Sequence, residues 1–212
     1  MFWLNSVMSA QATTRQVNYT WDDYRTWSDD ERWEIIGGQA YAMSPAPGTR
    51  HQGIQRELTR QLGNFFLGKR CQVFPAPTDV KLSDIDTVQP DLAVVCDPRK
   101  IKPTHIEGAP DLVVEVLSPS SETHDRIRKI ALYARSGVRE VWLVRPYPWL
   151  VEVFVLDGDS YRLRQIYGKD DTLASPTLKG LKVKLDNVFD FPLEPGEETP
   201  MIREGRPKYG KR

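Results

Sequence analysis

The chain of 212 residues has very few cysteines, which limits the kinds of site it can build. It contains only Cys71 and Cys96, with no C-x-x-C pair and no Cys/His zinc pattern. This excludes zinc-finger and thioredoxin-like motifs. Both cysteines lie in strand-like segments. We expect them to be small, buried, reduced side chains of a cytoplasmic protein.

The sequence also lacks an excess of charge of either sign. Its 29 Lys and Arg residues balance 29 Asp and Glu residues. A strongly basic chain would have indicated a nucleic-acid-binding protein, so a phosphate-binding surface must come here from local clusters. One candidate cluster surrounds a predicted helix, and the other lies in the C-terminal tail. Their members are Arg126, Arg128, Lys129, Arg135 and Arg139, and then Arg203, Arg206, Lys208, Lys211 and Arg212. Neither is specific, because most such charges only solvate a surface.

Long hydrophobic runs are missing as well. Residues 1–8 are weakly apolar but have no basic flank, and their apolar run is too short for a signal peptide. No other segment could span a membrane, so we expect no membrane partner. We expect a loose N-terminal arm over residues 1–17, one domain over 18–192, and a tail over 193–212 that is rich in Pro, Gly and charge.

The elements that are present predict a mixed α/β (α+β) domain. Apolar residues at helical spacing predict a long helix over 49–67, and Ser120 or Ser121 could cap a second helix over 122–136. A short helix should follow Thr20. Gly37-Gly38 and Asp157-Gly158 predict hairpins. Further strands are expected over 71–74, 78–82, 88–96, 111–118, 138–144 and 181–185. The expected architecture is a central mixed sheet flanked by helices, with added β-hairpins.

Two of these strands carry carboxylates that an ordinary buried strand would not contain. Asp91 and Glu115 stand in apolar runs 24 positions apart, and burying either as an unpaired ion is costly. Both acids and the carbonyl of Val116 would make an oxygen set suited to Mg²⁺ or Mn²⁺. Alternatively, they meet Arg or Lys at the strand ends, and spacing alone supports both interpretations equally. Asp111 lies about 13 Å along the strand from Glu115, too far to share an ion, and should only begin the strand.

A series of motifs follows in order along the chain: Glu34 before Gly37-Gly38, residues 44–47 before His51, Pro90-Asp91, residues 115–120, residues 125–129, Tyr133, and residues 137–144. This series resembles the Uma-two family of restriction-endonuclease-like proteins, within the PD-(D/E)XK nuclease-like superfamily. The resemblance covers residues 19–192. It implies a restriction-endonuclease-like fold and a metal-dependent endonuclease that hydrolyses the phosphodiester bonds of DNA.

The resemblance also implies roles for individual residues. The usual motif lysine is replaced by Leu117, and Lys129 on the following helix is the candidate for its function. Lys129 would orient the attacking water and offset phosphate charge. An apolar stripe of Ile127, Ile130, Ala131 and Ala134 should place Lys129 on the opposite side of the helix, between Leu132 and Tyr133. A surface lysine that snorkels over those two residues is the alternative.

Two more residues complete the predicted catalytic set. Glu34 would be an extra acid near the metal, or else a member of a surface hairpin pair. His51 begins the long helix and could cap it, bind phosphate or assist the metal, although a single histidine there is more often structural.

The alternative function is a catalytically degenerate nucleic-acid-binding or scaffold protein with the nuclease fold. Leu117 and the zero net charge favour it, whereas Asp91 and Glu115 favour the nuclease. A metal hydrolase that acts on another phosphoester is a third possibility. An exposed stretch from Trp142 to Trp149, together with the second hairpin, could support a homodimer.

Overall fold

The computed structural model describes residues 18–28, 31–43, 48–117, 122–193 and 195–197, with only the backbone described for 122–127. The predicted N-terminal arm, most of the tail, residues 44–47 and 118–121, and the side chain of Arg126 lie outside this set. The predicted boundaries of the domain at residues 18 and 192 stay a prediction.

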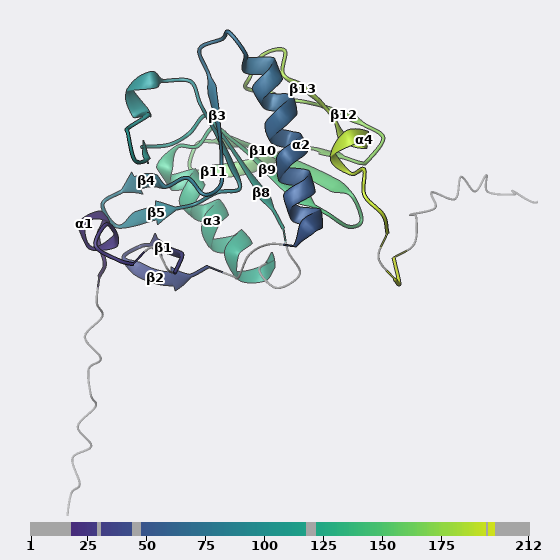
Figure 1. Ribbon diagram of the computed structural model, residues 1–212. Helices are drawn as coiled ribbons and strands as arrows, with labels where there is room; N and C mark the ends of the chain where they lie inside the picture. The colour runs from purple at the N-terminus through teal and green to yellow at the C-terminus, as the bar shows by residue number, and fades with distance from the viewer. Residues whose placement is uncertain (1–17, 29–30, 44–47, 118–121, 194, 198–212) are drawn as a thin grey trace, which may run out of the picture.

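A six-stranded mixed sheet forms the centre of the fold (Figure 1). Its strand order is β11-β10-β9-β8-β6-β3, and only β8 and β9 run parallel. The strands are β3 (Gln72–Pro75), β6 (Leu92–Val95), β8 (Leu112–Val116), β9 (Glu140–Arg145), β10 (Leu150–Asp157) and β11 (Ser160–Tyr167). The last two make the predicted second hairpin.

A separate five-stranded sheet has the order β2-β1-β5-β4-β7. Its strands are β1 (Trp33–Ile36), β2 (Gln39–Ala42), β4 (Val80–Ser83), β5 (Asp86–Val88) and β7 (Ile106–Glu107). The predicted single strand over 88–96 is wrong, because Gln89-Pro90-Asp91 separates β5 of this sheet from β6 of the larger one. Proline has no N–H to donate to a ladder, so pairing stops there. A third, two-stranded sheet joins β12 (Thr172–Ala174) to β13 (Lys182–Lys184).

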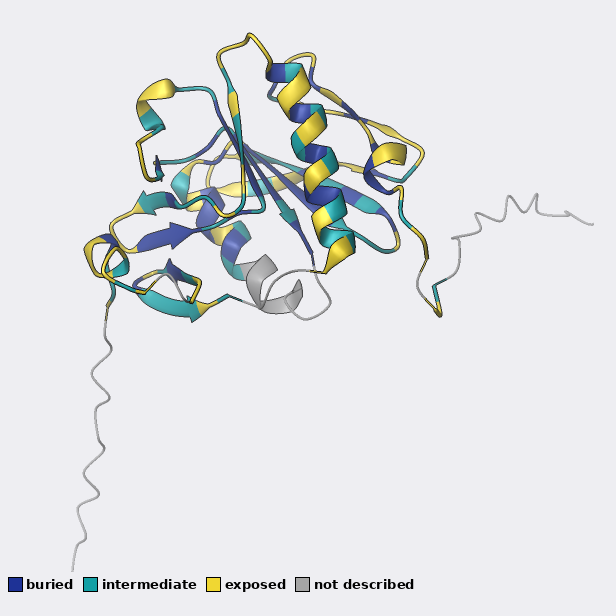
Figure 2. Cartoon of the chain, in the orientation of Figure 1, coloured by how far each residue is buried: buried dark blue, intermediate teal, exposed yellow. Residues whose placement is uncertain are grey.

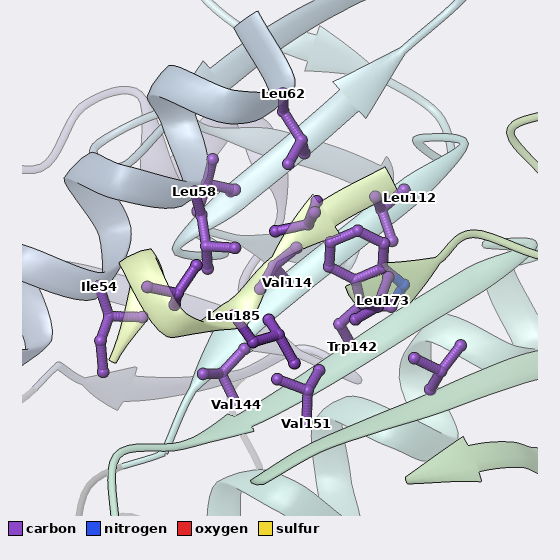
Figure 3. Packing of buried hydrophobic residues seen from close by; sticks show 14 of the residues in the cluster. Ile54, Leu58, Leu62, Leu112, Val114, Trp142, Val144, Val151, Leu173 and Leu185 are labelled. Atoms are coloured by element: carbon purple, nitrogen blue, oxygen red, sulfur yellow. The ribbon is translucent and has the colours of Figure 1, made fainter. Parts of the chain in front are cut away.

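The helices α2 (Thr49–Phe66) and α3 (Glu122–Ser136) pack on opposite faces of the larger sheet, which confirms the mixed α+β class. The other helices are α1 (Trp21–Tyr24) and α4 (Leu185–Val188), with a 3-10 turn at Pro98–Lys100. Strand alternation assigns Val114 and Trp142 to the core beneath α2, where Leu58 packs (Figure 3). Val113 and Leu143 face the opposite core, with Leu132 and Tyr133 of α3. Figure 2 shows the buried strands of the larger sheet between α2 and α3.

The expected exposed aromatic stretch is not exposed. Trp142 is completely buried in the core beneath α2, and Trp149 is 8% exposed. The reason is alternation along β9, which turns Trp142 toward the core with Val144. Among the described residues, no helix is both long enough and apolar enough to cross a membrane.

The two cysteines form a disulfide, so the prediction of reduced cysteines is wrong. Strands β3 and β6 pair with Gln72 opposite Val95, and this register brings Cys71 opposite Cys96. The two cysteines are 25 positions apart, so the sequence alone did not indicate that strand pairing brings them together. Disulfides are rare in cytosolic proteins, so the pairing also removes the support that cysteine usage gave to a cytoplasmic location.

The disulfide should contribute measurably to stability. Closing a 25-residue loop restricts the unfolded chain, so Cys71→Ser combined with Cys96→Ser should lower the free energy of unfolding by about 3 kcal/mol. Urea denaturation followed by circular dichroism measures the change. A reductant should destabilise the wild type to the same extent and leave the double variant unaffected. Equal stability of wild type and variant without reductant would contradict the pairing.

Candidate active site

Asp91 and Glu115 lie side by side at the end of two neighbouring strands, as the sequence suggested. The pairing of Leu92 with Val114 in antiparallel strands continues to Asp91 and Glu115, so both side chains lie on the same face. The backbone N–H of Val116 donates to Asp91 Oδ2 at 2.7 Å. The backbone oxygen of Asp91 accepts from the amide of Ala76 and from Nε2 of Gln55, both at 2.9 Å. The position of Asp91 is therefore fixed by two backbone N–H donors and the side-chain amide of Gln55.

Lys129 points into this site and not into solvent. Its Nζ lies 2.9 Å from Glu34 Oε1 and 3.3 Å from Glu115 Oε1, and its side chain is 11% exposed. The buried residues in the described part of α3 are Lys129, Leu132, Tyr133 and Ala134, and Ile130 packs against the second core. The predicted stripe is therefore wrong at Ala131, which is exposed, and in placing Lys129 away from the buried face, while the side chain of Ile127 lies outside the described residues. The snorkelling alternative does not describe this lysine.

Tyr133 is a site residue whose contact the sequence analysis missed. Its hydroxyl donates to Glu115 Oε1 at 2.5 Å, and its side chain is fully buried. The signal was available, because Lys129 and Tyr133 are four positions apart and share one helical face. Together they contact the same oxygen of Glu115 and hold its carboxylate in one orientation.

Glu34 reaches the site from the smaller sheet. Strand β1 pairs with β5 through Ile35 and Thr87, so Glu34 lies near the point where the chain leaves that sheet. The backbone N–H of Gln89 donates to Glu34 Oε1 at 3.0 Å. Glu34 is 5% exposed. The interpretation of Glu34 as a member of a surface hairpin pair is therefore wrong for this residue.

His51 lies in the first turn of α2, with Nε2 at 3.2 Å from Asp91 Oδ2. Burial acts to lower the pKa of His51. The hydrogen bond and charge of Asp91, aided by Glu115 and the backbone of Val116, outweigh burial and raise that pKa above its ordinary value. Nδ1 of His51 is buried and has no hydrogen-bond partner in the described part of the chain. The imidazole thus touches the same groups that the sequence suggested as metal ligands.

The charges at the site perturb one another strongly. Burial raises the pKa of Glu115 to about 7, Lys129 and Tyr133 oppose the increase, and Asp91 and Glu34 add to it. Burial acts to lower the pKa of Lys129, but Glu115 and Glu34 raise it above its usual range. Burial and the neighbouring carboxylates also raise the pKa of Tyr133 well above its ordinary value, so its hydroxyl keeps its proton. Strongly perturbed groups that cluster in this way are typical of functional sites.

No group of three or more His, Cys, Asp or Glu residues in the described ranges is arranged to hold a metal ion. Lys129 instead lies between Glu34 and Glu115, and His51 contacts Asp91. The donor chemistry still suits a hard cation. Asp91, Glu115 and the carbonyl of Val116 offer the carboxylate and carbonyl oxygens that Mg²⁺ and Mn²⁺ prefer.

Two other sequence expectations have clear outcomes. Asp111 begins β8 as a structural residue, accepting from the amide of Cys96 at 2.6 Å and pairing with Arg139. Leu117 is 7% exposed in the second core, so its position does not present a side chain to the site.

The described members of the predicted basic cluster around α3 each have their own partner. Arg135 pairs with Asp86 at 2.6 Å, and Arg139 pairs with Asp111. The guanidinium of Arg128 stacks over the ring of Tyr41 at 4.5 Å from its centroid. Each of these cations is engaged with a different partner, and Lys129 is buried.

Comparison with known proteins agrees with this geometry. Residues 21–186 match the Uma2 (Uma-two) family, which is described as "putative restriction endonuclease". An uncharacterized protein of Synechocystis is 35% identical over 174 residues, which are 79% of this chain and 90% of that protein. The crystal structure of a "putative nuclease" from Anabaena variabilis has the same fold, with a TM-score of 0.64 at 22% identity. The match covers 80% of this chain and 97% of that one.

The family match therefore spans both strands with the paired acids, the helix that carries Lys129, and the hairpin that carries Glu34. This chain belongs to the Uma2 family of restriction-endonuclease-like proteins.

Proposed function

We propose that this protein is a metal-dependent endonuclease that hydrolyses phosphodiester bonds in DNA. The observation that carries the proposal is the position of Lys129. Although Leu117 occupies the usual motif position, an ammonium group from α3 lies 3.3 Å from Glu115 and beside Asp91. A chain that had lost its chemistry would have no need to bury a lysine among carboxylates, since a buried charge is costly. The degenerate binding protein is therefore the weaker hypothesis.

Asp91, Glu115 and the carbonyl of Val116 would hold Mg²⁺ or Mn²⁺. Such an ion, when bound there, would lower the pKa of a water and stabilise the charge that develops on the phosphate oxygens. Lys129 orients the attacking water and offsets phosphate charge, because it is cationic and fixed in place. Glu34 positions Lys129, and Tyr133 positions Glu115. His51 assists by holding the carboxylate of Asp91, and its imidazole is a further candidate ligand.

The proposed homodimer now depends on the second hairpin alone, because Trp142 and Trp149 are buried. Strand β11 is an edge of the larger sheet and exposes Leu163 and Ile166, which are 44% and 49% exposed. An exposed edge strand with apolar side chains is a typical pairing surface.

The roles of Asp91 and Lys129 can be separated by substitution. Asp91→Asn should abolish metal binding, because the amide brings no charge. Lys129→Ala should retain metal binding and lose at least about 100-fold in cleavage rate, because it removes a charge that acts on water and phosphate. Calorimetric titration with Mn²⁺ measures the first effect, and nicking of supercoiled plasmid with Mg²⁺ or Mn²⁺ measures the second. Chelation of the metal should stop nicking by the wild type.

Two results would argue against this assignment. Equal nicking by wild type and Asp91→Asn would indicate a contaminating nuclease. Absence of metal-dependent nicking on several DNA substrates, by protein with a normal melting curve, would favour the binding-protein alternative. Melting curves of all variants show whether removal of a buried charge has disturbed the fold, which is a common result of leaving its partner unpaired.

Tyr133 provides a third test, because it orients a proposed ligand without touching the metal. Tyr133→Phe should lower the affinity for Mn²⁺ by about 10-fold to 100-fold, as is usual when a hydrogen-bond partner of a ligand is removed. Calorimetry measures the change. Tyr161→Phe is a matched control, since the Tyr161 hydroxyl donates to the carbonyl of Val138 away from the acids. Identical metal affinity in the two variants would rule out a positioning role for Tyr133.

A further inference from the structure

A cavity of about 280 Å³ is lined by parts of both large sheets. Its walls come from Phe74 of β3, residues 77–79 that lead into β4, Gln89, and residues 101–106 that lead into β7. Pockets for drug-sized molecules usually measure about 300–1,000 Å³, so this cavity suits a single small ring system. None of its lining residues belongs to the proposed catalytic set.

The cavity lies at the same end of the smaller sheet as Glu34. Val80 of β4 pairs with Val88 of β5, and β5 pairs in turn with β1, which carries Glu34 (Figure 1). Asp79 directly precedes Val80. Neighbouring strands are about 4.8 Å apart, so the backbones of Asp79 and Glu34 are roughly 10 Å apart. Gln89 connects the two places, because its backbone N–H donates to Glu34 and it also lines the cavity.

Asp79 is held by hydrogen bonds at only one of its carboxylate oxygens. Oδ1 accepts from the hydroxyl of Tyr24 at 2.7 Å and from Nε2 of Gln89 at 2.9 Å. The side-chain oxygen of Gln89 is fixed in turn by the guanidinium of Arg32, at 2.6 and 2.9 Å. No group in the described ranges donates to Asp79 Oδ2. Because Asp79 lines the cavity, Oδ2 is the acceptor that it offers to a ligand.

The other walls of the cavity are flat or apolar. Phe74 and His105 contribute aromatic rings, and Pro77 and Pro103 contribute apolar ones. The ring of His105 also packs against Trp21, with the two centroids 4.6 Å apart, so its position is fixed. Aromatic side chains stack on the face of any nucleic-acid base. The cavity therefore combines stacking surfaces with one oriented hydrogen-bond acceptor.

We infer that this cavity binds one base of the nucleic acid, out of its stack, and that Asp79 Oδ2 accepts a hydrogen bond from an amino group of that base. Cytosine offers such a group at N4, which Asp commonly recognises, and adenine and guanine also carry one. Thymine presents a carbonyl oxygen in place of the cytosine amino group, and a carboxylate repels it.

The inference rests on the proposed function, because the base belongs to the strand that the acids would cleave. A separation of roughly 10 Å corresponds to about three nucleotides along a B-form strand, at 3.4 Å for each. One strand can therefore occupy the cavity and the active site together. Such a base must be extruded from a duplex or come from a single strand, since the cavity admits it only unstacked.

The test measures binding without cleavage. Fluorescein-labelled oligothymidylate and oligodeoxycytidylate of equal length are titrated with the full chain in EDTA, with fluorescence anisotropy as the readout. The wild type should bind the cytosine strand about tenfold more tightly, as expected for one hydrogen bond to a charged group. Equal affinity for the two strands would overturn the inference.

An isosteric variant reverses the expected preference. Asp79→Asn keeps one oxygen for Tyr24 and Gln89 and replaces the free acceptor with an NH₂ donor, so it should bind the thymine strand more tightly than the cytosine strand. Asp190→Asn removes the same charge at an exposed position and should keep the wild-type preference. The ratio of the two affinities is compared, so a general gain from the lost negative charge cancels. An unchanged ratio in Asp79→Asn, in protein with a normal melting curve, refutes the role of Asp79.

His105 tests the stacking surface independently of the acceptor. His105→Ala removes the ring and should weaken the binding of both strands about tenfold, while the ratio of their affinities stays at the wild-type value. His105→Phe provides a flat ring again and should recover most of the affinity. Equal losses in the two variants would show that the ring does not stack on a base, and would contradict the proposed mode of binding.

The remaining outcomes separate the cavity from the nuclease proposal. Displacement of the cytosine strand by an equal concentration of free deoxycytidine monophosphate would identify a free-nucleotide site and overturn the binding of a strand. Metal-dependent nicking of plasmid by a wild type without base preference would refute the base site and leave the nuclease proposal standing. If the wild type neither binds the strands nor nicks plasmid, both proposals fail.

Discussion

The ammonium group of Lys129 connects the parts of this protein that must come together for a site to exist. It lies between Glu34 of the smaller sheet and Glu115 of the larger one, and Lys129 itself belongs to α3. Removing one partner from a buried ion pair typically costs about 3–5 kcal/mol, because the other charge is left uncompensated. The packing of the two sheets and the helix is therefore linked directly to the geometry of the acids.

The chain passes between the two sheets at the same place. Gln89, Pro90 and Asp91 are consecutive, yet the amide of Gln89 binds Glu34 while the side chain of Asp91 binds the amide of Val116. The side-chain oxygen of Gln89 accepts hydrogen bonds from the guanidinium of Arg32, and its side-chain nitrogen donates to Asp79 at 2.9 Å. A proline in the middle prevents either ladder from continuing. The short segment between the sheets thus contains one of the acids, Asp91, and orients a second, Glu34, through the backbone N–H of Gln89.

Local pattern was enough to predict most elements, because their signals lie within a few residues. The helical spacing of Ile54, Leu58 and Leu62 predicted α2, and positive φ angles at Gly37 and Gly38 match the predicted hairpin turn. The neighbouring positions of Asp91 and Glu115 were also predictable once both were assigned to adjacent strands. The Uma-two resemblance supplied Lys129 and Glu34, which composition alone would have left as ordinary surface charges.

The features that were missed depend on contacts between distant segments. The disulfide requires the register of β3 on β6, the second sheet requires the break at Pro90, and the orientation of α3 requires its packing against the second core. Glu140 illustrates the same difficulty. It is completely buried in β9, where it accepts from Trp142 Nε1 at 2.6 Å and from both hydroxyls of Ser175 and Thr177. These hydroxyls lie 35 and 37 positions further along the chain, so no local pattern around Glu140 indicates that they will satisfy it.

The balance of charge at the site explains how three acids can be buried before any ion binds. Glu34, Asp91 and Glu115 face one lysine and one histidine, and the raised pKa of His51 favours its charged form beside Asp91. The raised pKa of Glu115, about 7, shows that these two side chains do not fully offset the repulsion among the acids. A divalent cation on the proposed oxygen ligands would supply further positive charge and would favour the ionised form of Glu115.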